Sequence, residues 1–378
     1  MSIIEPERHL RGELMKNMKI GLIPFFMSIF ILLSGCGSDN AVSAYSKYNY
    51  EFLGAFDTVI QFMGYAKSQQ DFEKMAKIGE ARFVELNKLF DIYNDYDGIN
   101  NIKTINDNAG IKPVEVSQEV MDLIQFSKDW YNKTGGYVNI ALGPVLSIWH
   151  NYREAGINDP ENAELPPMDI LHEAAGYTDI NKVIVDKDKR TVFLSDKNMS
   201  LDVGAVAKGY STEIVAKELE EQGFTSFIIS SGGNVRVSGK PLDGVREKWG
   251  IGIQNPDGDP LNPNDTPLDT AFIESGSVVT SGDYQRYYMV NSVRYNHIID
   301  SGTLMPADHY RAVTVYTKNS GEADFLSTTL FILPYDQSRK LAEGLDGVEA
   351  LWIMPDGTIQ ATDKMKQLLK NMGGATNK

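Results

Sequence analysis

The spacing of apolar side chains predicts several helices along the chain. In the segment 70–90, apolar residues recur at three- and four-residue intervals and Gly79 shares their face, which predicts an amphipathic helix. The segment 116–132 has the same periodicity. Further helices are expected within 201–223, after a loop, and over 322–332.

Short runs of β-branched and aromatic residues predict strands between these helices. They lie at 58–62, 227–230, 249–254, 271–281 and 311–316, and a final hairpin is expected from 351–354 and 358–361. Strands and helices do not alternate regularly, so the pattern favours an α+β fold with mixed, mainly antiparallel sheets and packed helices. No linker divides the body, and we expect a single domain over 49–365 with a tail at 366–378.

The amino terminus has the pattern of an export signal. An apolar run at 20–35 follows Lys16 and Lys19 and is shorter than a membrane-spanning helix requires. Leu33-Ser34-Gly35-Cys36 resembles a bacterial lipobox, which implies a signal peptide over 1–35 and a lipid on the Cys36 thiol. The small polar residues up to 48 are expected to form a flexible tether. An uncleaved membrane anchor is the alternative, and translation could start at Met15 or Met18.

Charge and cysteine content narrow the classes of function. The chain carries 36 basic and 51 acidic side chains, a net charge of −15, and removal of residues 1–35 leaves −16. This balance disfavours nucleic-acid binding, and membrane attachment would depend on lipid rather than on a basic patch. The single cysteine excludes an internal disulfide and any multi-cysteine metal site. The fingerprints GxGxxG, GxxxxGK[ST], HExxH and GxSxG are absent.

Two segments have the composition of a phosphate and metal site. The segment 202–210 combines a strand end, a glycine turn and a helix start with Lys208, an arrangement that favours phosphate. Asp324 and Thr328 are four residues apart on the predicted helix, so both oxygens can face one hard cation such as Mg²⁺. An ordinary turn and a solvated side-chain pair are the alternatives.

Two further segments could border a planar ligand. The segment 280–300 gathers hydroxyls, tyrosines and His297 within about one hairpin, and 134–149 combines a glycine-flanked backbone with Trp149. An aromatic-rich hairpin and simple loop punctuation explain these patterns equally well.

Six ordered motifs resemble the ApbE family of FAD:protein FMN transferases. They are TGGYVNIALGPVLSIW (134–149), DVGAVAKGY (202–210), SGGN (231–234), VTSGDYQRYY (279–288), HIIDSGTLMP (297–306) and EADFLSTTLF (322–331). The resemblance covers about 50–362. Two places depart from the family pattern: Ser301 follows HIID where proline is usual, and Val138-Asn139 replaces Phe-Asp.

The resemblance implies an ApbE-like fold that binds FAD and Mg²⁺ and transfers FMN to a Thr or Ser hydroxyl, with release of AMP. The acceptor would be a flavoprotein of an extracytoplasmic electron-transport system, and the enzyme would lie on the extracytoplasmic face of the cell membrane, held by its lipid. An FAD pyrophosphatase that releases FMN and AMP, or a non-catalytic flavin-binding lipoprotein, remains an alternative.

Family motifs also imply roles for individual residues. The metal ligands would be Asp324, Thr328 and the backbone carbonyl of Ala205. The flavin-nucleotide contacts would be Phe56, Tyr93, Ala141, Leu142, Gly143, Asp202, Lys208, Ile298 and Ser327. His297 is the expected general base, because its ordinary pKa lies near neutral pH, and Asp283 is the second candidate.

Overall fold

The computed structural model describes residues 44–258 and 266–378. The expected signal peptide and the Cys36 lipidation site lie outside the described residues. Ala41–Pro256 and Pro267–Lys378 make up one compact unit. No helix in the described part of the chain is long and apolar enough to cross a membrane.

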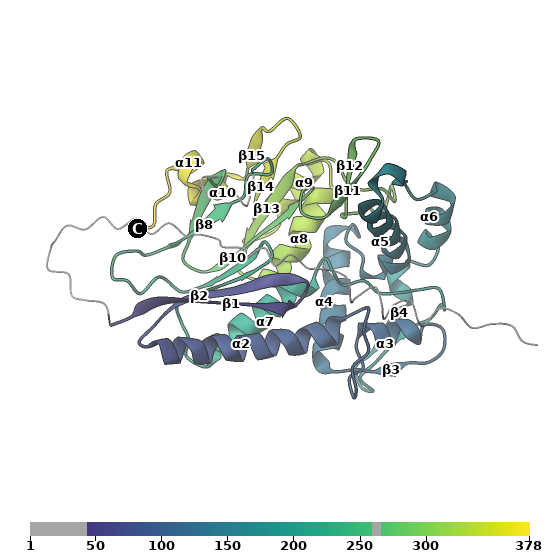
Figure 1. Cartoon of the computed structure of the whole chain (residues 1–378), viewed down its shortest axis with the longest axis horizontal. Coiled ribbons are helices and arrows are strands. Elements are labelled where there is room, and N and C mark those ends of the chain that lie inside the picture. Colours follow the sequence, from purple (N-terminus) through teal and green to yellow (C-terminus); the bar gives the residue numbers. More distant parts are fainter. Residues whose placement is uncertain (1–43, 259–265) are drawn as a thin grey trace, which may run out of the picture. The chain divides into compact units, whose positions relative to one another are not determined.

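An antiparallel sheet of eight strands is the centre of this unit (Figure 1). Its strands, in spatial order, are β1 (Ser46–Ala55), β2 (Thr58–Ala66), β6 (Phe227–Ser231), β7 (Asn234–Ser238), β10 (Gly276–Gly282), β13 (Ala312–Thr317), β14 (Glu349–Ile353) and β15 (Ile359–Ala361). Each neighbouring pair runs antiparallel. The expected α+β class is confirmed, and the predicted final hairpin is β14–β15. β1 begins at Ser46, before the expected end of the tether.

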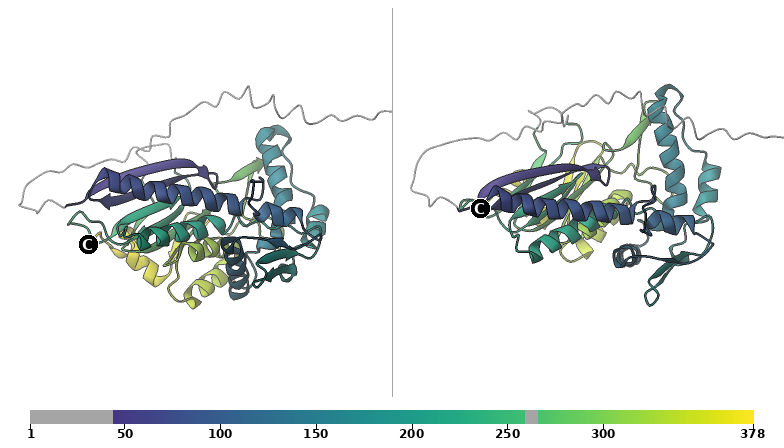
Figure 2. Two further views of the ribbon diagram at one scale, coloured as in Figure 1. Left: turned by 90° about the horizontal axis from the view of Figure 1, so that it is seen from below. Right: turned by 60° about the horizontal axis from the view of Figure 1, so that its bottom comes forward.

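Helices cover one face of this sheet. α2 (Gln69–Phe90) packs on β1 and β2 and runs beside α7 (Ala207–Glu221), which in turn packs on α8 (Ser320–Ile332) (Figure 2). Successive side chains of each strand point to opposite faces of the sheet, so the strands contribute to two separate cores. Val313 and Val315 of β13 pack against the helices, whereas Ala312 belongs to the core on the other face. The predicted helix 116–132 is α4 (Gln118–Thr134), and the Ser117 hydroxyl accepts a hydrogen bond from Val120 N as its N-cap.

The opposite face is covered by β8 (Trp249–Ile253), β9 (Asp269–Ile273), α10 (Asp363–Leu368) and α11 (Lys370–Gly373). The expected single strand at 271–281 is wrong, because the chain turns after Ile273 and resumes in the central sheet as β10. Gly276 has a φ of 110° at this turn, a conformation that favours glycine. The expected tail contains part of α10 and all of α11, and Leu369 there is fully buried.

A smaller core lies beside the sheet. It joins α5 (Gly143–Asn158) and α6 (Met168–Ala175) to the hairpin β11 (Tyr287–Val290) and β12 (Val293–Asn296), with Trp149 and Tyr288 buried at its centre. The other elements include α3 (Ile102–Asp107), α9 (Tyr335–Gly344) and a small sheet of β3 (Val114–Glu115), β5 (Thr191–Leu194) and β4 (Val183–Asp186). Three short 3-10 helices lie at Ile140–Leu142, Pro160–Asn162 and Ile180–Lys182.

Candidate active site

A cleft of about 900 Å³ lies where the central sheet meets the α5 region. Its walls come from the β1–β2 turn, the segment after α2, α5, the start of α7, β10 and α8, so they span the chain from Phe56 to Ile332. The volume suits a large cofactor or nucleotide. Ten of the site residues predicted from the sequence line this one cleft: Phe56, Tyr93, Leu142, Asp202, Ala205, Lys208, His297, Ile298, Asp324 and Thr328.

The Asp324 carboxylate is held at the bottom of the cleft by the start of α7. Gly209 N donates a 2.7 Å hydrogen bond to Asp324 Oδ2. A Cβ on Gly209 would lie 2.4 Å from Asp324 Cβ and from the Ser320 carbonyl oxygen, so glycine permits this close approach of α7 to α8. Burial raises the pKa of Asp324, while Lys208 and the Gly209 hydrogen bond oppose the rise.

Oxygen donors at this corner fit a hard cation. Asp324 and Thr328 project from the same face of α8, and Ala205 lines the same cleft. Ser281 Oγ lies 3.4 Å from Thr328 Oγ1. No group of three or more His, Cys, Asp or Glu residues that could hold a metal occurs in 44–258 or 266–378. A site with one carboxylate and neutral oxygens suits Mg²⁺, which keeps water or substrate phosphate as its other ligands.

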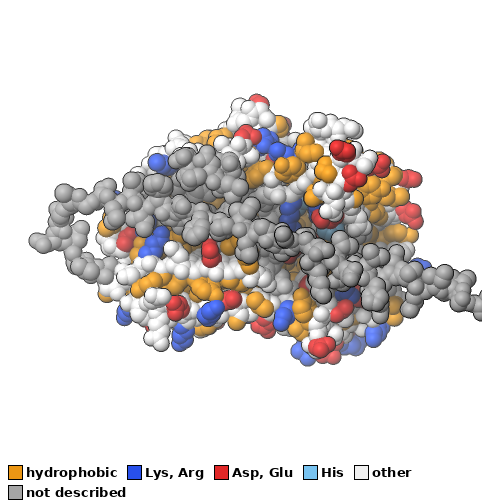
Figure 3. Space-filling model, in the orientation of Figure 1, with side chains coloured by type: hydrophobic (Ala, Val, Ile, Leu, Met, Phe, Trp, Pro, Cys, Tyr) orange, Lys and Arg blue, Asp and Glu red, His pale blue; other side chains and the backbone are white. Residues whose placement is uncertain are grey.

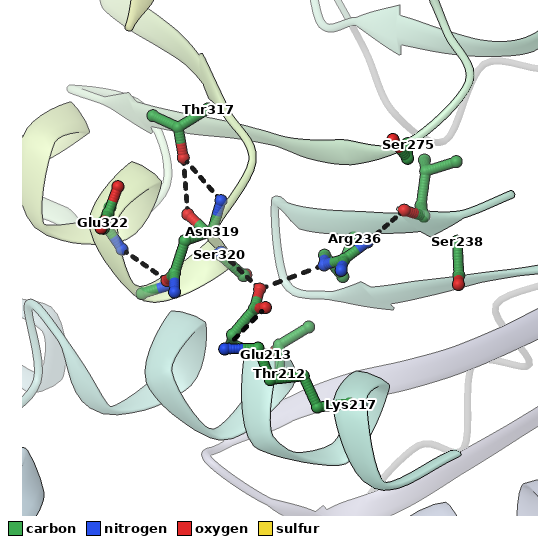
Figure 4. A network of polar contacts seen from close by, with 12 residues as sticks. Thr212, Glu213, Lys217, Arg236, Ser238, Ser275, Thr317, Asn319, Ser320 and Glu322 are labelled. Carbon is green, nitrogen blue, oxygen red and sulfur yellow. Dashed lines mark hydrogen bonds and ion pairs between the residues drawn. The ribbon is translucent and has the colours of Figure 1, made fainter. Parts of the chain in front are cut away.

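A buried ion pair fixes the first turn of α8 (Figure 4). Glu213 Oε2 of α7 accepts hydrogen bonds from Ser320 N at 2.8 Å and from Arg236 Nε at 3.1 Å. Ser320 Oγ donates to Asn234 Oδ1, while the buried Asn234 Nδ2 has no hydrogen-bond partner among the described residues. The network therefore sets the position of the helix that carries Asp324.

His297 follows β12 and is anchored to the backbone of Arg286. His297 N donates to the Arg286 carbonyl oxygen at 3.0 Å, and Nδ1 lies 3.2 Å from the same oxygen. Because a carbonyl oxygen only accepts, Nδ1 carries the proton and Nε2 remains an acceptor. Burial, with the cations Arg286, Arg153 and Lys208, lowers the pKa of His297 to about 3, so the imidazole is neutral at neutral pH.

Phe56 and Tyr93 lie at the cleft's aromatic side. Phe56 and Asp57 have φ values of 55° and 50°, the conformation of a tight two-residue turn between twisted antiparallel strands, and Phe56 N donates to Asn87 Oδ1 at 2.8 Å. Tyr93 is 60% exposed, and its ring centroid lies 5.9 Å from that of His150. The exposed ring is available to stack on a planar ligand.

Four predicted site residues do not line the cleft. Ala141 and Ser327 are fully buried behind its wall, and a Cβ on Gly143 would lie 2.5 Å from the Ser200 carbonyl oxygen. Asp283, our second candidate base, is turned away from the cleft. It forms ion pairs with Arg294 at 3.2 Å and Arg311 at 3.0 Å.

Two cationic residues of the cleft were not singled out from the sequence. Arg286 lies within the segment 279–288, so the motif could have identified it as a site residue. Arg153 lies beyond the segment 134–149, and its only signal is its spacing of seven residues from Leu146 on one face of α5.

Comparisons with known proteins agree with this arrangement. The family model described as ApbE family matches residues 56–352. A Treponema pallidum protein named FAD:protein FMN transferase is 31% identical over 274 residues, which cover 69% of this chain and 72% of the relative. A Klebsiella pneumoniae protein of the same name is 30% identical over 253 residues, 67% of this chain and 74% of the relative.

Solved structures show the same fold. The ApbE protein of Thermotoga maritima superposes with a TM-score of 0.72 at 27% identity, covering 85% of this chain and 99% of the other. The flavin transferase ApbE of Vibrio cholerae superposes with a TM-score of 0.69 at 21% identity, over 86% and 99% of the two chains. From its sequence, its fold and the common cleft of its motifs, this chain belongs to the ApbE family.

Proposed function

We propose that this protein is a Mg²⁺-dependent FAD:protein FMN transferase that attaches FMN to a Thr or Ser hydroxyl of an acceptor flavoprotein and releases AMP. The observation that carries the proposal is the single cleft that holds Asp324, Thr328, Lys208 and the free Nε2 of His297. A cation site, a phosphate-binding cation and a base are the groups that cleavage of a pyrophosphate requires.

Asp324, Thr328 and the Ala205 carbonyl would hold the metal ion. Bound there, Mg²⁺ would neutralise charge on the pyrophosphate oxygens. Lys208 makes no ion pair within the described part of the chain, so its ammonium is available to a phosphate oxygen. The start of α7 adds the partial positive charge of its backbone N–H groups.

His297 would activate the acceptor. Its neutral Nε2 takes the proton of the Thr or Ser hydroxyl as that oxygen forms a bond to the phosphorus of the FMN half. The bond from this phosphorus to the bridging oxygen breaks, and AMP leaves with the bridging oxygen. The low pKa of His297 favours its neutral imidazole but also makes it a weaker base.

Incubation with FAD, Mg²⁺ and a candidate acceptor, followed by mass spectrometry of the acceptor, tests this proposal. A mass gain equal to FMN, with stoichiometric AMP, is the expected result. Free FMN and AMP with an unmodified acceptor would instead identify an FAD pyrophosphatase. Intact FAD would identify a flavin-binding protein without catalysis.

We further propose that the enzyme is attached to the extracytoplasmic face of the cell membrane by a lipid on Cys36. The lipobox-like sequence Leu33-Ser34-Gly35-Cys36 supports this location. Its acceptor would then be a flavoprotein of an extracytoplasmic electron-transport system. Labelling of cells with a palmitate analogue tests the lipid, and labelling of intact cells with a membrane-impermeant reagent tests the side of the membrane.

A further inference from the structure

One face of α5 forms a long wall of the cleft. Its side chains recur at three- and four-residue intervals: Leu146, Trp149, His150, Arg153, Glu154 and Ile157. From the first to the last of them the helix rises about 16 Å, at 1.5 Å per residue. The wall therefore carries His150 and Arg153 along the same cleft as His297.

Arg153 is held in place on this wall by the imidazole of His150. Its Nη2 lies 2.9 Å from His150 Nδ1, and because a guanidinium only donates, the imidazole accepts. Its Nε is 3.9 Å from Glu154 Oε1, which is too long for a hydrogen bond. The Arg153 side chain is only 15% exposed, so its charge is partly desolvated, and its ion pair with Glu154 is a long one.

Arg286 brings a second positive charge to the same part of the cleft. Within 44–258 and 266–378, its guanidinium forms no ion pair or hydrogen bond. Burial lowers the pKa of Arg153, and Arg286 contributes to the lowering, as expected for like charges that lie close together.

Besides Glu154, the carboxyl group that acts on Arg153 is that of Asp202, which experiences the positive potential of both arginines. Asp202 Oδ1 accepts a 2.8 Å hydrogen bond from Gly204 N, and no ion pair joins Asp202 to either arginine in the described residues. Two guanidinium groups are thus gathered beside Glu154 and Asp202, and neither acid is hydrogen-bonded to them within the described residues. Such an arrangement is stabilised when an anion enters between them.

We propose that Arg153 and Arg286 form a clamp for one phosphoryl group of FAD, distinct from the metal corner and able to bind phosphate without the metal ion. The inference rests on the proposed function, because FAD supplies two phosphoryl groups. One phosphoryl group of the pyrophosphate binds at the site of Asp324, Thr328 and Lys208. The other phosphoryl group binds between the two arginines. Planar guanidinium groups match phosphate oxygens in bidentate pairs, which fixes orientation as well as charge.

Ligand binding to the full-length protein in detergent, with EDTA present, tests the clamp. The probes are FMN against riboflavin and AMP against adenosine, so that each pair isolates the contribution of a phosphate. We expect wild-type protein to bind at least one phosphorylated probe more tightly than its partner. Arg153→Met and Arg286→Met should each reduce that ratio by at least about tenfold. Arg339→Met is the matched control, because Arg339 pairs with Glu343 on α9 outside the cleft.

Each outcome has one interpretation. If the variants lose the preference for FMN over riboflavin, the clamp binds the phosphate that is transferred. If they lose the preference for AMP over adenosine, the clamp binds the phosphate that leaves. Equal ratios in wild type and both cleft variants, or no phosphate preference in metal-free wild type, overturn the clamp. If the ratios fall as expected but wild type with Mg²⁺ modifies no acceptor, the proposed transferase function fails while the clamp stands.

Discussion

At the scale of single residues, burial shifts the pKa values of Asp324, the proposed metal ligand, and His297, the proposed base, in opposite directions. Desolvation raises the pKa of the Asp324 carboxyl and lowers that of the His297 imidazole, so both are pushed towards their neutral forms. Neutrality suits His297 as a proton acceptor. Asp324, however, must be ionised to bind a cation, so binding of Mg²⁺ should weaken as the pH falls.

Asp324→Asn should abolish metal binding while the amide oxygen can still accept from Gly209 N. We expect transfer to fall by about two orders of magnitude or more, since the ion supplies several kcal/mol of charge stabilisation. Mg²⁺ should raise the Tm of wild type but not of the variant. Asp336→Asn, on α9 outside the cleft, is the control. Undiminished stabilisation of Asp324→Asn by Mg²⁺ would show that the metal lies elsewhere.

The pH dependence of transfer should reveal the cations around His297. With a pKa of about 3, the imidazole stays neutral as the pH falls from 8 to about 5, so its titration causes no loss of rate in that range. Arg286→Met removes a charge that lowers this pKa. The acid limb of the pH–rate profile should therefore move to higher pH. An acid limb that stays in place would exclude His297 as the titrating base.

At the scale of elements, the close approach of α7 and α8 builds the proposed metal site. Periodicity predicted both helices, and the four-residue spacing predicted that Asp324 and Thr328 share a face. The Gly209–Asp324 hydrogen bond could not be predicted, because it joins residues 115 positions apart through tertiary packing. The break between β9 and β10 was missed although Glu274, Ser275 and Gly276 stand between the two apolar runs, a sequence typical of a turn. The two strands pair with different neighbours.

Glu213→Gln should destabilise the first turn of α8. The change removes the buried counter-charge of Arg236, which keeps its ion pair with Glu220 at 3.3 Å, and it weakens the acceptor of Ser320 N. Breaking a buried pair outright costs about 3–5 kcal/mol, and the remaining partner reduces that cost. Urea denaturation measures the free energy of unfolding. The control Glu343→Gln breaks an exposed pair with Arg339 and should cost under about 1 kcal/mol. Equal effects of the two changes would contradict the structural role of Glu213.

Gly209→Ala should separate α7 from α8. The new Cβ would meet Asp324 Cβ and the Ser320 carbonyl oxygen, and overpacking of this kind costs about 1–3 kcal/mol. We expect weaker Mg²⁺ binding as well, which calorimetry would detect. Gly344→Ala on α9 is the control, because nothing lies within 4 Å of a new Cβ there. It should leave the stability and the Mg²⁺ affinity unchanged. Wild-type Mg²⁺ affinity in Gly209→Ala would refute this coupling.

At the scale of the whole molecule, six motifs dispersed along the chain predicted one cleft, and the structure brings residues of all six to it. The Arg153–Arg286 pair was missed because Arg153 lies beyond the motif 134–149, and only the helical geometry of α5 carries its side chain to the cleft wall. The net charge of −15 is distributed over the molecule, and on the face drawn in Figure 3 acidic and basic side chains are interspersed.

Cys36→Ser should release the protein from the membrane fraction if the lipid provides the attachment. Wild-type attachment should survive washing with about 1 M salt, which screens charges beyond about 3 Å. Immunoblots of cell fractions measure the distribution of both proteins. Release of wild type by salt would identify an electrostatic attachment instead, and retention of Cys36→Ser would identify an uncleaved anchor.

The wide separation of the cleft residues along the chain has a consequence for biosynthesis. The metal corner joins Ala205 to Thr328, and the outer strands of the central sheet are the first, β1, and the last, β15. Pairing over such distances is slow to form, because loop closure must precede the contacts that reward it. A nascent chain that ends before Asp324 lacks two of the three proposed ligands of the cation, Asp324 and Thr328. If the proposed function holds, the chain cannot act on FAD until α8 has been synthesised.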